Sequence, residues 1–534
     1  MSKKGQKVHN QIVFIPYIQN QLTLPMSLES LIPENHVVRV INSAIDQMNL
    51  EPILAKYPGG GRSSYNPVMM TKLLVYAYTD KLFSCRRIAK AARENIMYMW
   101  LCGGNKPDFM AVNRFRSERM KDTILEVFAE VVDLMVRENY IKLENYFLDG
   151  TKIEANANKY SWVWGKATKR YKQALIEKCR DLFTEIDKIN ENENEEYGDS
   201  DLEELGDGKP IDSGAIEEAV RKIDERLAQK SQDEKPDAET KELKKARRTL
   251  DKDYLPRMQK YEGQEAILKE RNSYSKTDHD ATFMRMKEDP MKNGQLKPGY
   301  NVQIGTENQF IVGYSIHQRP GDTSCMTEHL EIVKDMLGGN LPKNIIADAG
   351  YGSEENYEYL MDNQLGYYVK YNTFHKESSE KWKSDVTKTQ NFSYLENEDE
   401  YVCGYGRRLV FKKELHRKSY NGYLSKIRVY ECSNCSGCPH RDKCVKSEDP
   451  FANRIININR KLNVLKEQAR QNLCSEEGRK MRNLRPVEVE SVFGDIKGNF
   501  GMRRFLLKGL EKVKIEWGLH CIAHNMRKIA VLMG

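Results

Sequence analysis

The first regular pattern along the chain is helical and covers residues 29–138. Apolar positions recur there three and four residues apart, the spacing of one face of a helix. Pro67 stands in the favoured first position of one such segment, and Ser84 can cap the next one. A longer segment shows its apolar face in Phe115, Ile124, Val127, Phe128 and Val131. The pattern predicts a domain of short and medium helices.

Strand patterns follow this helical part. Tyr146-Phe147-Leu148 form a short apolar strand that we expect to stop at Asp149-Gly150. Residues 300–318 contain two alternating runs around Glu307-Asn308, which predicts a hairpin. Residues 344–363 then give a buried strand, an acidic end, a Gly-rich turn and a helix. This order predicts an α/β protein with a mixed sheet whose rim carries the chemistry.

The charges are distributed unevenly, with one acidic segment in an otherwise basic chain. Residues 181–220 hold 15 acidic and 2 basic side chains, about −13 in all, so the remainder is near +20 because the whole chain carries +7. A basic bulk with one acidic segment is consistent with a polyanionic partner, and equally with a soluble protein that has an acidic linker. The helices of 165–270 are expected to have mixed charge, with a loop over the acidic stretch.

These patterns predict five parts. They are a helical domain (1–138), an α/β core (139–164 and 271–370), a charged helical insertion (165–270), a Cys-rich insertion (371–460) and a C-terminal helical part of the core (461–534). The sequence has no run of 18 apolar residues and no signal-peptide pattern at its start, so we expect a cytoplasmic protein without contact to a membrane.

Two aspartates follow apolar strand segments directly. Phe147-Leu148 precede Asp149, and Ile345-Ile346-Ala347 precede Asp348. A glycine soon follows each, which allows a sharp turn at a sheet edge. A carboxylate on a buried strand is costly unless it meets a cation or a donor. Each aspartate is therefore a candidate metal ligand, although one such aspartate alone more often caps a turn.

A third acid lies in a later helical segment. Val489, Val492, Phe493 and Ile496 define the apolar face. Glu490 lies beside that face, and Lys497 follows seven residues later on the same side. An acid directed at metals and a lysine directed at phosphate is one interpretation, and a surface helix with an internal ion pair is the other.

As an ordered set, these segments resemble a known family. LDGTKIEANANKY, IIADAGYGSEENY and VESVFGDIKGNFGMRRFLLKG are similar to the Asp, Asp and Glu regions of the DDE transposases of bacterial insertion sequences. PGGGRSSYNPVMMTKLLVYAY and SCRRIAKAARENIMYMWLCGG resemble the helical domain before the core in one large group of them. The resemblance covers most of the chain except 165–270 and implies an RNase H-like core.

The resemblance also implies a chemistry. Asp149, Asp348 and Glu490 would bind two Mg²⁺ (or Mn²⁺) ions, which serve cleavage at the element's ends and joining to target DNA. Lys497 would hold phosphate as a point charge. The partners would be double-stranded DNA and a second copy of the chain, in a dimer or a larger synaptic assembly. A nuclease on the same core and a zinc-containing DNA-binding regulator without catalysis remain the alternatives.

The family's motif around the last acid is only half matched. Many relatives show Tyr-x2-Arg-x3-Glu-x6-Lys, and Glu490 with Lys497 fits its second half, while the Arg position falls on Pro486. Glu488 is the second choice for the acid, because Asp495 would then stand at the Lys position. The phosphate-binding arginine stays open among Arg482, Arg485, Arg503 and Arg504.

The basic residues of the helical domain offer a second DNA contact. Arg86, Arg87, Lys90 and Arg93 would share an exposed face of a short helix. This arrangement suits a helix-turn-helix DNA binder and equally an ordinary bundle with a solvated basic face.

Four of the eleven cysteines fall within 13 residues, as Cys432-x2-Cys435-x2-Cys438-x5-Cys444. Four thiolates at this spacing predict a closed, structural zinc site, with His440 or Cys403 as substitutes for one ligand. An iron–sulfur cluster is the rival, although the usual spacing to its fourth cysteine is absent. A loop without metal is the third possibility.

Two further pairs of residues have side chains that could carry chemistry. His520 and His524 are four residues apart but lack the acid of a zinc-protease motif, so packing or a DNA contact is the favoured interpretation. Trp162 and Trp164 could stack on a base, but residues of this kind more often belong to a core.

Overall fold

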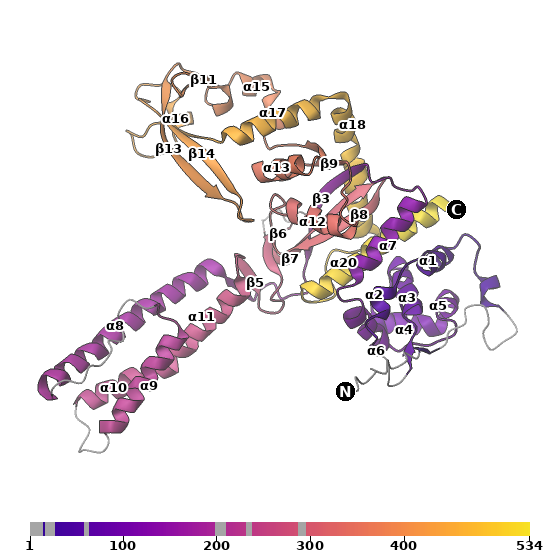
Figure 1. Cartoon of the computed structure of the whole chain (residues 1–534), viewed down its shortest axis with the longest axis horizontal. Helices are drawn as coiled ribbons and strands as arrows, with labels where there is room; N and C mark the ends of the chain where they lie inside the picture. Colours follow the sequence, from indigo (N-terminus) through magenta and orange to yellow (C-terminus); the bar gives the residue numbers. More distant parts are fainter. Residues whose placement is uncertain are drawn as a thin grey trace, which may run out of the picture. The chain divides into compact units, whose positions relative to one another are not determined.

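The computed structural model describes residues 14–15, 27–57, 63–197, 210–230, 238–286 and 295–533. The chain divides into two compact units. The first contains residues 1–154 and 300–534, and the second contains residues 155–299. The predicted insertion, 165–270, lies inside the second unit. Figure 1 follows the chain through both.

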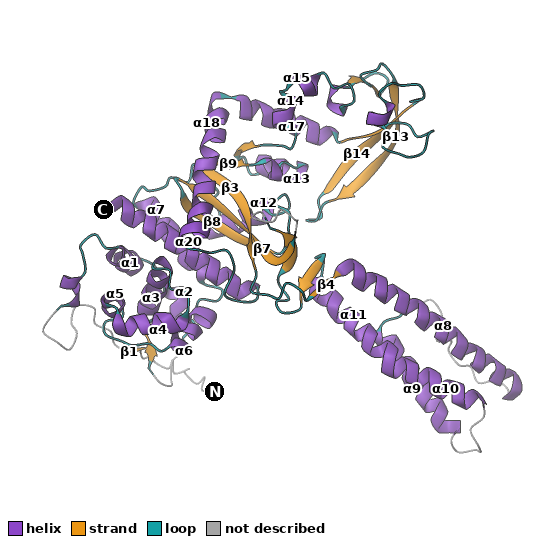
Figure 2. Ribbon diagram, turned by 180° about the vertical axis from the view of Figure 1, so that it is seen from behind, coloured by secondary structure: helices purple, strands orange, loops and turns teal. Residues whose placement is uncertain are grey.

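The N-terminal part of the first unit is helical, as the pattern predicts (Figure 2). Helix α3 is buried along almost its whole length, and its Lys72 is fully buried and pairs with Asp46 at 2.7 Å. Ser84 precedes α4, but its side chain makes no capping hydrogen bond. The elements are β1 (Phe14–Ile15), η1 (Leu28–Leu31), α1 (Val37–Asp46), α2 (Glu51–Leu54), β2 (Ser64–Tyr65), α3 (Pro67–Thr79), α4 (Cys85–Glu94), α5 (Ile96–Leu101), α6 (Phe109–Arg114), η2 (Phe115–Arg119) and α7 (Ile124–Arg137).

A mixed sheet forms the centre of the first unit, which confirms the predicted α/β class. Its order is β10–β9–β3–β7–β6, and β8 also pairs with β7, at residues 301–307. Strands β3, β9 and β10 run parallel, whereas β7 and β8 form an antiparallel hairpin. The strands are β3 (Asn145–Glu154), β6 (Thr282–Arg285, in the second unit), β7 (Leu296–Glu307), β8 (Phe310–His317), β9 (Asn344–Ala347) and β10 (Gly366–Val369).

The β7–β8 hairpin turns one residue later than predicted, at Asn308 and Gln309. Both residues have positive φ, 52° and 60°, as a two-residue turn of this hand requires. Glu307, the last residue of β7, accepts hydrogen bonds from four successive backbone N–H groups at 2.6–3.2 Å, those of residues 142–145. This carboxylate therefore fixes the point where the chain enters β3.

Helices surround the sheet and connect it to the N-terminal part. The last helix, α20, packs against β8 and also against α3 and α7. Helix α18 packs against β9 and β10. These helical elements are α12 (Met326–Met336), η4 (Ala349–Tyr351), α13 (Glu354–Asp362), α17 (Arg460–Cys474), α18 (Glu476–Arg485), η6 (Pro486–Glu490), α19 (Ser491–Gly494), η7 (Asp495–Asn499) and α20 (Leu510–Met533).

The Cys-rich region forms a second, antiparallel sheet in the same unit, in the order β11–β12–β13–β14–β15. A small core with Leu409, Tyr430 and Ile456 lies beneath it. Its elements are α14 (Phe374–Glu377), α15 (Glu380–Lys383), η5 (Thr389–Asn391), β11 (Ser393–Leu395), β12 (Glu400–Val402), β13 (Arg408–Lys418), β14 (Leu424–Cys432), α16 (Arg441–Cys444) and β15 (Ile455–Ile458).

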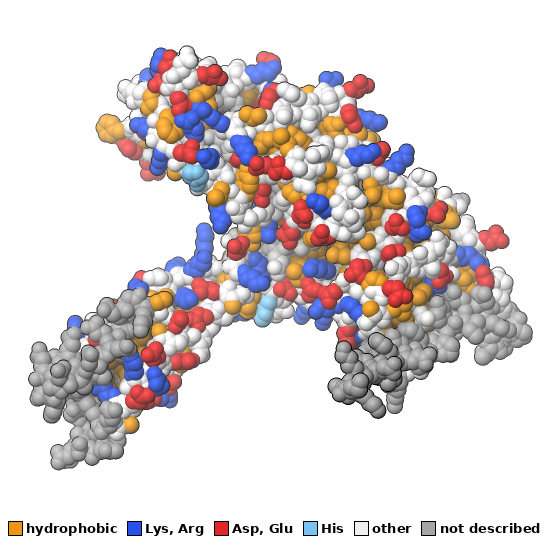
Figure 3. Space-filling model, viewed as in Figure 1, with side chains coloured by type: hydrophobic (Ala, Val, Ile, Leu, Met, Phe, Trp, Pro, Cys, Tyr) orange, Lys and Arg blue, Asp and Glu red, His pale blue; other side chains and the backbone are white. Residues whose placement is uncertain are grey.

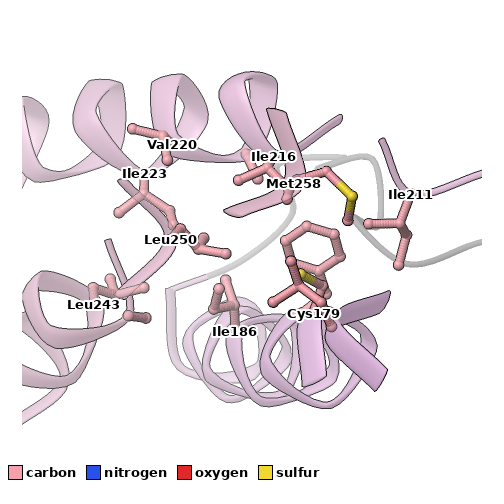
Figure 4. Close-up of a cluster of buried hydrophobic side chains, with 13 residues drawn as sticks. Cys179, Ile186, Ile211, Ile216, Val220, Ile223, Leu243, Leu250 and Met258 are labelled. Atoms are coloured by element: carbon pink, nitrogen blue, oxygen red, sulfur yellow. The ribbon is translucent and has the colours of Figure 1, made fainter. Parts of the chain in front are cut away.

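The second unit is mainly a helical bundle with its own core. Leu175, Cys179, Phe183 and Ile186 recur at helical spacing and are buried. Figure 4 shows such side chains meeting between the helices. The elements are β4 (Trp162–Trp164), α8 (Gly165–Tyr197), α9 (Ser213–Lys230), α10 (Ala238–Thr249), η3 (Leu250–Tyr254), α11 (Leu255–Leu268) and β5 (Ser273–Ser275).

The acidic stretch was predicted to be a loop, but its first part belongs to α8, which continues to Tyr197. The remainder, residues 198–209, lies outside the described residues. Among the helices that the structure describes, none has both the length and the apolar character needed to cross a bilayer.

Candidate active site

Asp149 and Asp348 lie side by side because of the register between two parallel strands. Leu148 of β3 pairs with Ala347 of β9, and these are the last paired residues of the two strands. The next residue of each strand is the predicted aspartate. Two carboxylates that are 199 positions apart in the sequence therefore reach the same level of the sheet.

The structure corrects one expectation about Asp149. We expected the strand to end there with a turn at Gly150, but β3 continues to Glu154. The glycine is needed for a different reason, since a Cβ at position 150 would overlap the amide of Gln303 and lie 2.7 Å from Asp322 Oδ1. Gly150 therefore leaves room for neighbouring polar side chains. Asp149 is buried inside this strand, and its side chain is 8% exposed.

Asp348 has the more open position of the two. It ends β9, and its Oδ1 accepts a hydrogen bond from Gly350 N at 2.8 Å, so it also caps the short turn η4. Its side chain is 42% exposed. The capping interpretation and the metal-ligand interpretation of this residue are therefore compatible.

One arginine connects all three predicted acids. Arg485 Nη2 lies 3.2 Å from Asp149 Oδ1 and 3.8 Å from Asp348 Oδ2. Its Nη1 lies 3.8 Å from Glu490 Oε1. The guanidinium is buried, and its Nε has no hydrogen-bond partner among the described residues. The three carboxylates thus surround one cationic group, beside the middle of β3 and just beyond the end of β9.

A π-helical turn explains why Arg485 was not identified from the motif spacing. The family motif places the arginine four residues before the glutamate, whereas Arg485 is five residues before Glu490. Residues Pro486–Glu490 form a π-helix, whose turn takes up about one residue more than an α-helical turn. The extra residue in the turn offsets the extra residue in the sequence, so both side chains reach the same site.

Glu488 has a different environment from Glu490. Its Oε2 accepts a hydrogen bond from Gln309 N at 2.6 Å, in the turn between β7 and β8. Burial raises the pKa of the Glu488 carboxyl, while the Gln309 N–H and the nearby Lys528 lower it. Glu488 therefore stabilises the hairpin turn, whereas the Glu490 side chain is 62% exposed and lies beside Arg485.

The comparisons with known proteins agree with this picture. Residues 402–530 match a family model described as a transposase DDE domain. Residues 26–118 match one described as a transposase domain (DUF772). Both matches support the resemblance of the chain to the DDE transposases. Glu490 lies within the first match, whereas Asp149 and Asp348 lie outside both. Comparison with curated proteins finds no match, and comparison with solved structures finds none either.

The other basic residues predicted near the last acid have three different surroundings. Lys497 Nζ donates a hydrogen bond to Thr151 Oγ1 at 2.7 Å, and Thr151 follows Asp149 on the same side of β3. Arg503 and Arg504 are exposed near the end of β3, where Arg504 lies 3.9 Å from Glu154. Arg482 instead covers the ring of Phe374, with its guanidinium 5.2 Å from the ring centroid.

Arg86 and Arg87 are exposed on α4, in the N-terminal helical part of the chain. The Arg86 guanidinium lies 4.9 Å from the ring centroid of Phe109. Lys90 is also exposed and forms an ion pair with Glu94 at 3.6 Å. The basic face that the sequence predicts is therefore present, and its contact with DNA stays a prediction.

Sequence reasoning missed Asp322, a fourth acid beside the site. Its Oδ1 accepts hydrogen bonds from Asn301 Nδ2 at 2.8 Å and Gln303 Nε2 at 3.1 Å. The Tyr351 hydroxyl in turn donates to Gln303 Oε1. Burial raises the pKa of Tyr351, and the charges of Asp322, Asp149 and Asp348 raise it further. A polar residue in a Gly-Asp loop gives no periodic signal, so only the fold could reveal this position.

Lys370 was also missed. It follows β10, and its pKa is lowered by burial and by the positive charges of Arg485 and Arg482, while Asp348 raises it. It adds a second cationic side chain near the ends of the parallel strands. From the sequence alone, a lysine after a strand cannot be distinguished from an ordinary surface lysine.

The carboxylates fit divalent cations in their chemistry. Carboxylate oxygens are the ligands that Mg²⁺ prefers, and two of the three side chains have enough exposure to rotate. In the present arrangement, no group of three or more His, Cys, Asp or Glu side chains in the described residues is spaced to hold a metal ion. The Arg485 guanidinium stands between the acids, so it would have to move for them to share ions.

The cysteine cluster contains the four predicted cysteines and also Cys403. They line a cavity of about 20 Å³, enough for a single atom or ion. Backbone N–H groups of Arg407 and Arg454 donate to the sulfurs of Cys403 and Cys435, both at 3.3 Å. Burial raises the pKa of the Cys432 thiol to about 11, and the neighbouring Cys435 and Cys403 contribute to the rise. The sulfurs are soft donors of the kind that structural zinc takes, but in the present arrangement no three of these described side chains are spaced to hold an ion.

The predicted histidine and tryptophan pairs have structural surroundings. His520 is buried among the rings of Tyr78, Phe83 and Phe500, and burial lowers its pKa to about 3. His524 bridges Asp495, at 2.8 Å, and the backbone oxygen of Gln309, at 3.0 Å. Within the second unit, Trp162 and Trp164 pack against the ring of Phe283.

Proposed function

We propose that this DDE transposase cleaves DNA at the ends of an insertion sequence and joins those ends to target DNA. The observation that carries the proposal is the convergence of Asp149, Asp348 and Glu490 on the buried Arg485 guanidinium. Carboxylates are seldom gathered around one point of a sheet edge unless a cation offsets their repulsion. The match of residues 402–530 to a transposase DDE domain supports the same conclusion.

The strand order supports an RNase H-like core. Strand β3 is central, with the β7–β8 hairpin on one side and the parallel strands β9 and β10 on the other. That is the arrangement the family resemblance implies, with the first aspartate on the central strand and the second at the end of its parallel neighbour. The glutamate then comes from a C-terminal helical segment.

Asp149, Asp348 and Glu490 would hold the divalent ions, whose chemistry is to activate the attacking oxygen and stabilise the leaving one. Before the ions bind, Arg485 offsets the negative charge of the carboxylates. Once they have bound, Arg485 would be free to contact a phosphate oxygen. Arginine suits such a role because its planar group can bind carboxylate or phosphate with two donors.

Two lysines would position the DNA backbone at the site. Lys497 is held next to Asp149 through Thr151, at 2.7 Å. Lys370 lies on the other side, within the field of Arg485 and Asp348. Both are point charges suited to phosphate oxygens.

We further propose a structural Zn²⁺ in the cysteine cluster, with ligands drawn from Cys432, Cys435, Cys438, Cys444 and Cys403. A thiolate set without an open position leaves no place for a reacting group. The ion would stabilise the sheet from which β13 and β14 extend. Two DNA ends must be brought together for joining, so a homodimer or larger assembly is part of the proposal.

A cleavage and strand-joining assay tests the proposal. It uses Mg²⁺ and DNA carrying the sequence that flanks this gene, and it compares wild type with Asp348→Ala. We expect wild type to cut and join, and Asp348→Ala to bind DNA without doing either. Asp362→Ala is the matched control, because Asp362 is exposed at the end of α13.

Two outcomes would contradict the proposal. If wild type and both variants bind DNA equally and none cuts, even with Mn²⁺ and both ends supplied, a DNA-binding regulator is the better conclusion. If wild type cuts but never yields joined products, the chain is a nuclease with the same core.

A further inference from the structure

The β13–β14 hairpin extends beyond the sheet to which it belongs (Figures 1 and 2). Strand β12 pairs with β13 only at residues 408–409, and β15 pairs with β14 only at residues 428–431. Residues 415–418 and 424–427 pair only with each other. All eight residues 411–418 are exposed, so neither face of this ribbon is covered by the described parts of the chain. A two-stranded ribbon without a partner layer is only marginally stable in water.

The exposed ribbon is strongly basic. Residues 411–426 contain five Lys or Arg side chains, one His and a single acid, Glu414. That acid pairs with Lys426 at 3.7 Å and with His416 at 3.6 Å. Three further basic residues lie on β13: Lys413, Arg417 and Lys418. Within the described residues, none of the three forms an ion pair with an acidic side chain. Figure 3 shows Lys and Arg side chains over these strands, among apolar ones.

Exposed apolar side chains lie among these charges. Leu415 is 42% exposed and Leu424 is 62% exposed. These exposed leucines would make no favourable contact with small ions or water. Base edges and sugars, by contrast, offer apolar contact next to the phosphates.

The end of the hairpin is attached to the loop that carries Asp322. Asn421 Oδ1 accepts a hydrogen bond from Arg319 at 2.6 Å, and the Arg319 guanidinium lies 4.2 Å from the ring centroid of Tyr420. Asn421 Nδ2 donates to Glu355 Oε1, at the start of α13, at 2.8 Å. The next residue of that loop, Thr323, donates to Gly350 O, two residues after Asp348. The hairpin thus extends from the cysteine cluster, at Cys432, to the loop of Asp322 beside Asp348.

We infer that the β13–β14 hairpin is a binding surface for the backbone and groove of duplex DNA, with Lys413, Arg417 and Lys418 contacting phosphates. The inference rests on the proposed function, because it names where the DNA lies as it enters that site. The major groove admits a two-stranded ribbon. Residues 412–418 span roughly 20 Å at the rise of a strand, about the length of six base pairs. The tip contacts hold the ribbon in one orientation relative to Asp348.

The test is the salt dependence of DNA binding. Fluorescence anisotropy with a labelled, mixed-sequence duplex would be measured between about 50 and 200 mM salt. The test variant is Lys413→Gln/Arg417→Gln/Lys418→Gln. The matched control is Lys241→Gln/Lys244→Gln/Lys245→Gln, which removes the same charge from exposed positions of α10.

Each phosphate contact that is lost reduces the magnitude of the negative slope of log K against log salt concentration by about 0.9. We expect the hairpin variant to lose about 2 to 3 from this slope, and the control variant to keep the wild-type value. If the hairpin variant behaves like the control, the inference is wrong and the proposed function is untouched. If wild type binds no duplex at all, the proposed function itself fails. If the hairpin variant changes only self-association, measured by sedimentation velocity, the surface binds a second copy and the inference is again wrong.

Discussion

Two glutamates that stand two residues apart, Glu488 and Glu490, should respond to substitution in opposite ways. Glu490 is exposed and lies beside Arg485, with Nη1 and Oε1 3.8 Å apart. The Glu490 carboxylate is largely exposed, and the buried Arg485 keeps Asp149 and Asp348 as partners, so this pair should contribute only about 0–1 kcal/mol to the free energy of unfolding. Glu490→Gln should therefore leave the stability almost unchanged.

The same change should remove most of the activity. Residues that only support a metal ligand cost about 10- to 100-fold when they are altered, so the loss of a ligand should cost more than about 100-fold. The measurement is the rate of strand cleavage at saturating Mg²⁺, together with the Mg²⁺ concentration needed for half the maximal rate. Both should change for Glu490→Gln.

Glu488→Ala should show the reverse. Its carboxylate is 9% exposed and accepts the Gln309 N–H at 2.6 Å. Removing it leaves a part-buried donor without a partner, which costs about 1–3 kcal/mol of unfolding free energy. Cleavage per folded molecule should remain near the wild-type rate.

Denaturant unfolding and cleavage rates on the same preparations separate the two residues. The assignment of Glu490 is refuted if Glu490→Gln cleaves at the wild-type rate while Glu488→Gln, which keeps the side-chain shape, is inactive. If both variants lose activity in proportion to their loss of stability, neither glutamate acts in the chemistry.

Three further predictions follow from the same contacts. Arg485→Lys, which shortens the fork that reaches the three acids, should slow cleavage about 10- to 100-fold, and an unchanged rate would exclude its role at the site. Wild type should contain about one zinc ion per chain, measured by mass spectrometry, and Cys438→Ser should contain less. Cys474 is exposed, so Cys474→Ser should keep the wild-type zinc content. Equal zinc contents in the two variants would contradict the site. Burial lowers the pKa of His520 to about 3 in the folded chain, against about 6.5 in the unfolded chain. Between these pH values only the unfolded chain binds a proton at this side chain. The free energy of unfolding should therefore fall as the pH drops from about 6.5 to about 3, by up to about 1.4 kcal/mol per pH unit. Urea unfolding at several pH values should show a smaller decrease for His520→Phe than for wild type, and identical profiles would rule out this contribution.

Local patterns in the sequence were sufficient for the elements and for the chemistry-bearing residue types. Helical spacing predicted the N-terminal helices, and alternating runs predicted the β7–β8 hairpin, whose turn lies one residue later than expected. Apolar segments directly before Asp149 and Asp348 marked two acids as unusual, and the two family-model matches agree with the resemblance of the ordered segments. These signals are local because side-chain periodicity and turn chemistry depend on near neighbours.

The tertiary structure alone decided which residues meet. The pairing of Leu148 with Ala347 brings the aspartates level, and no local pattern encodes that register. The π-helical turn at Pro486–Glu490 moves Arg485 into the site, a shift of one residue that motif spacing cannot show. Asp322 joins the rim, and Cys403 the cysteine cluster, through contacts with segments distant in the sequence. Register, helix irregularity and loop contacts result from packing over the whole unit, and for this reason they had to be observed.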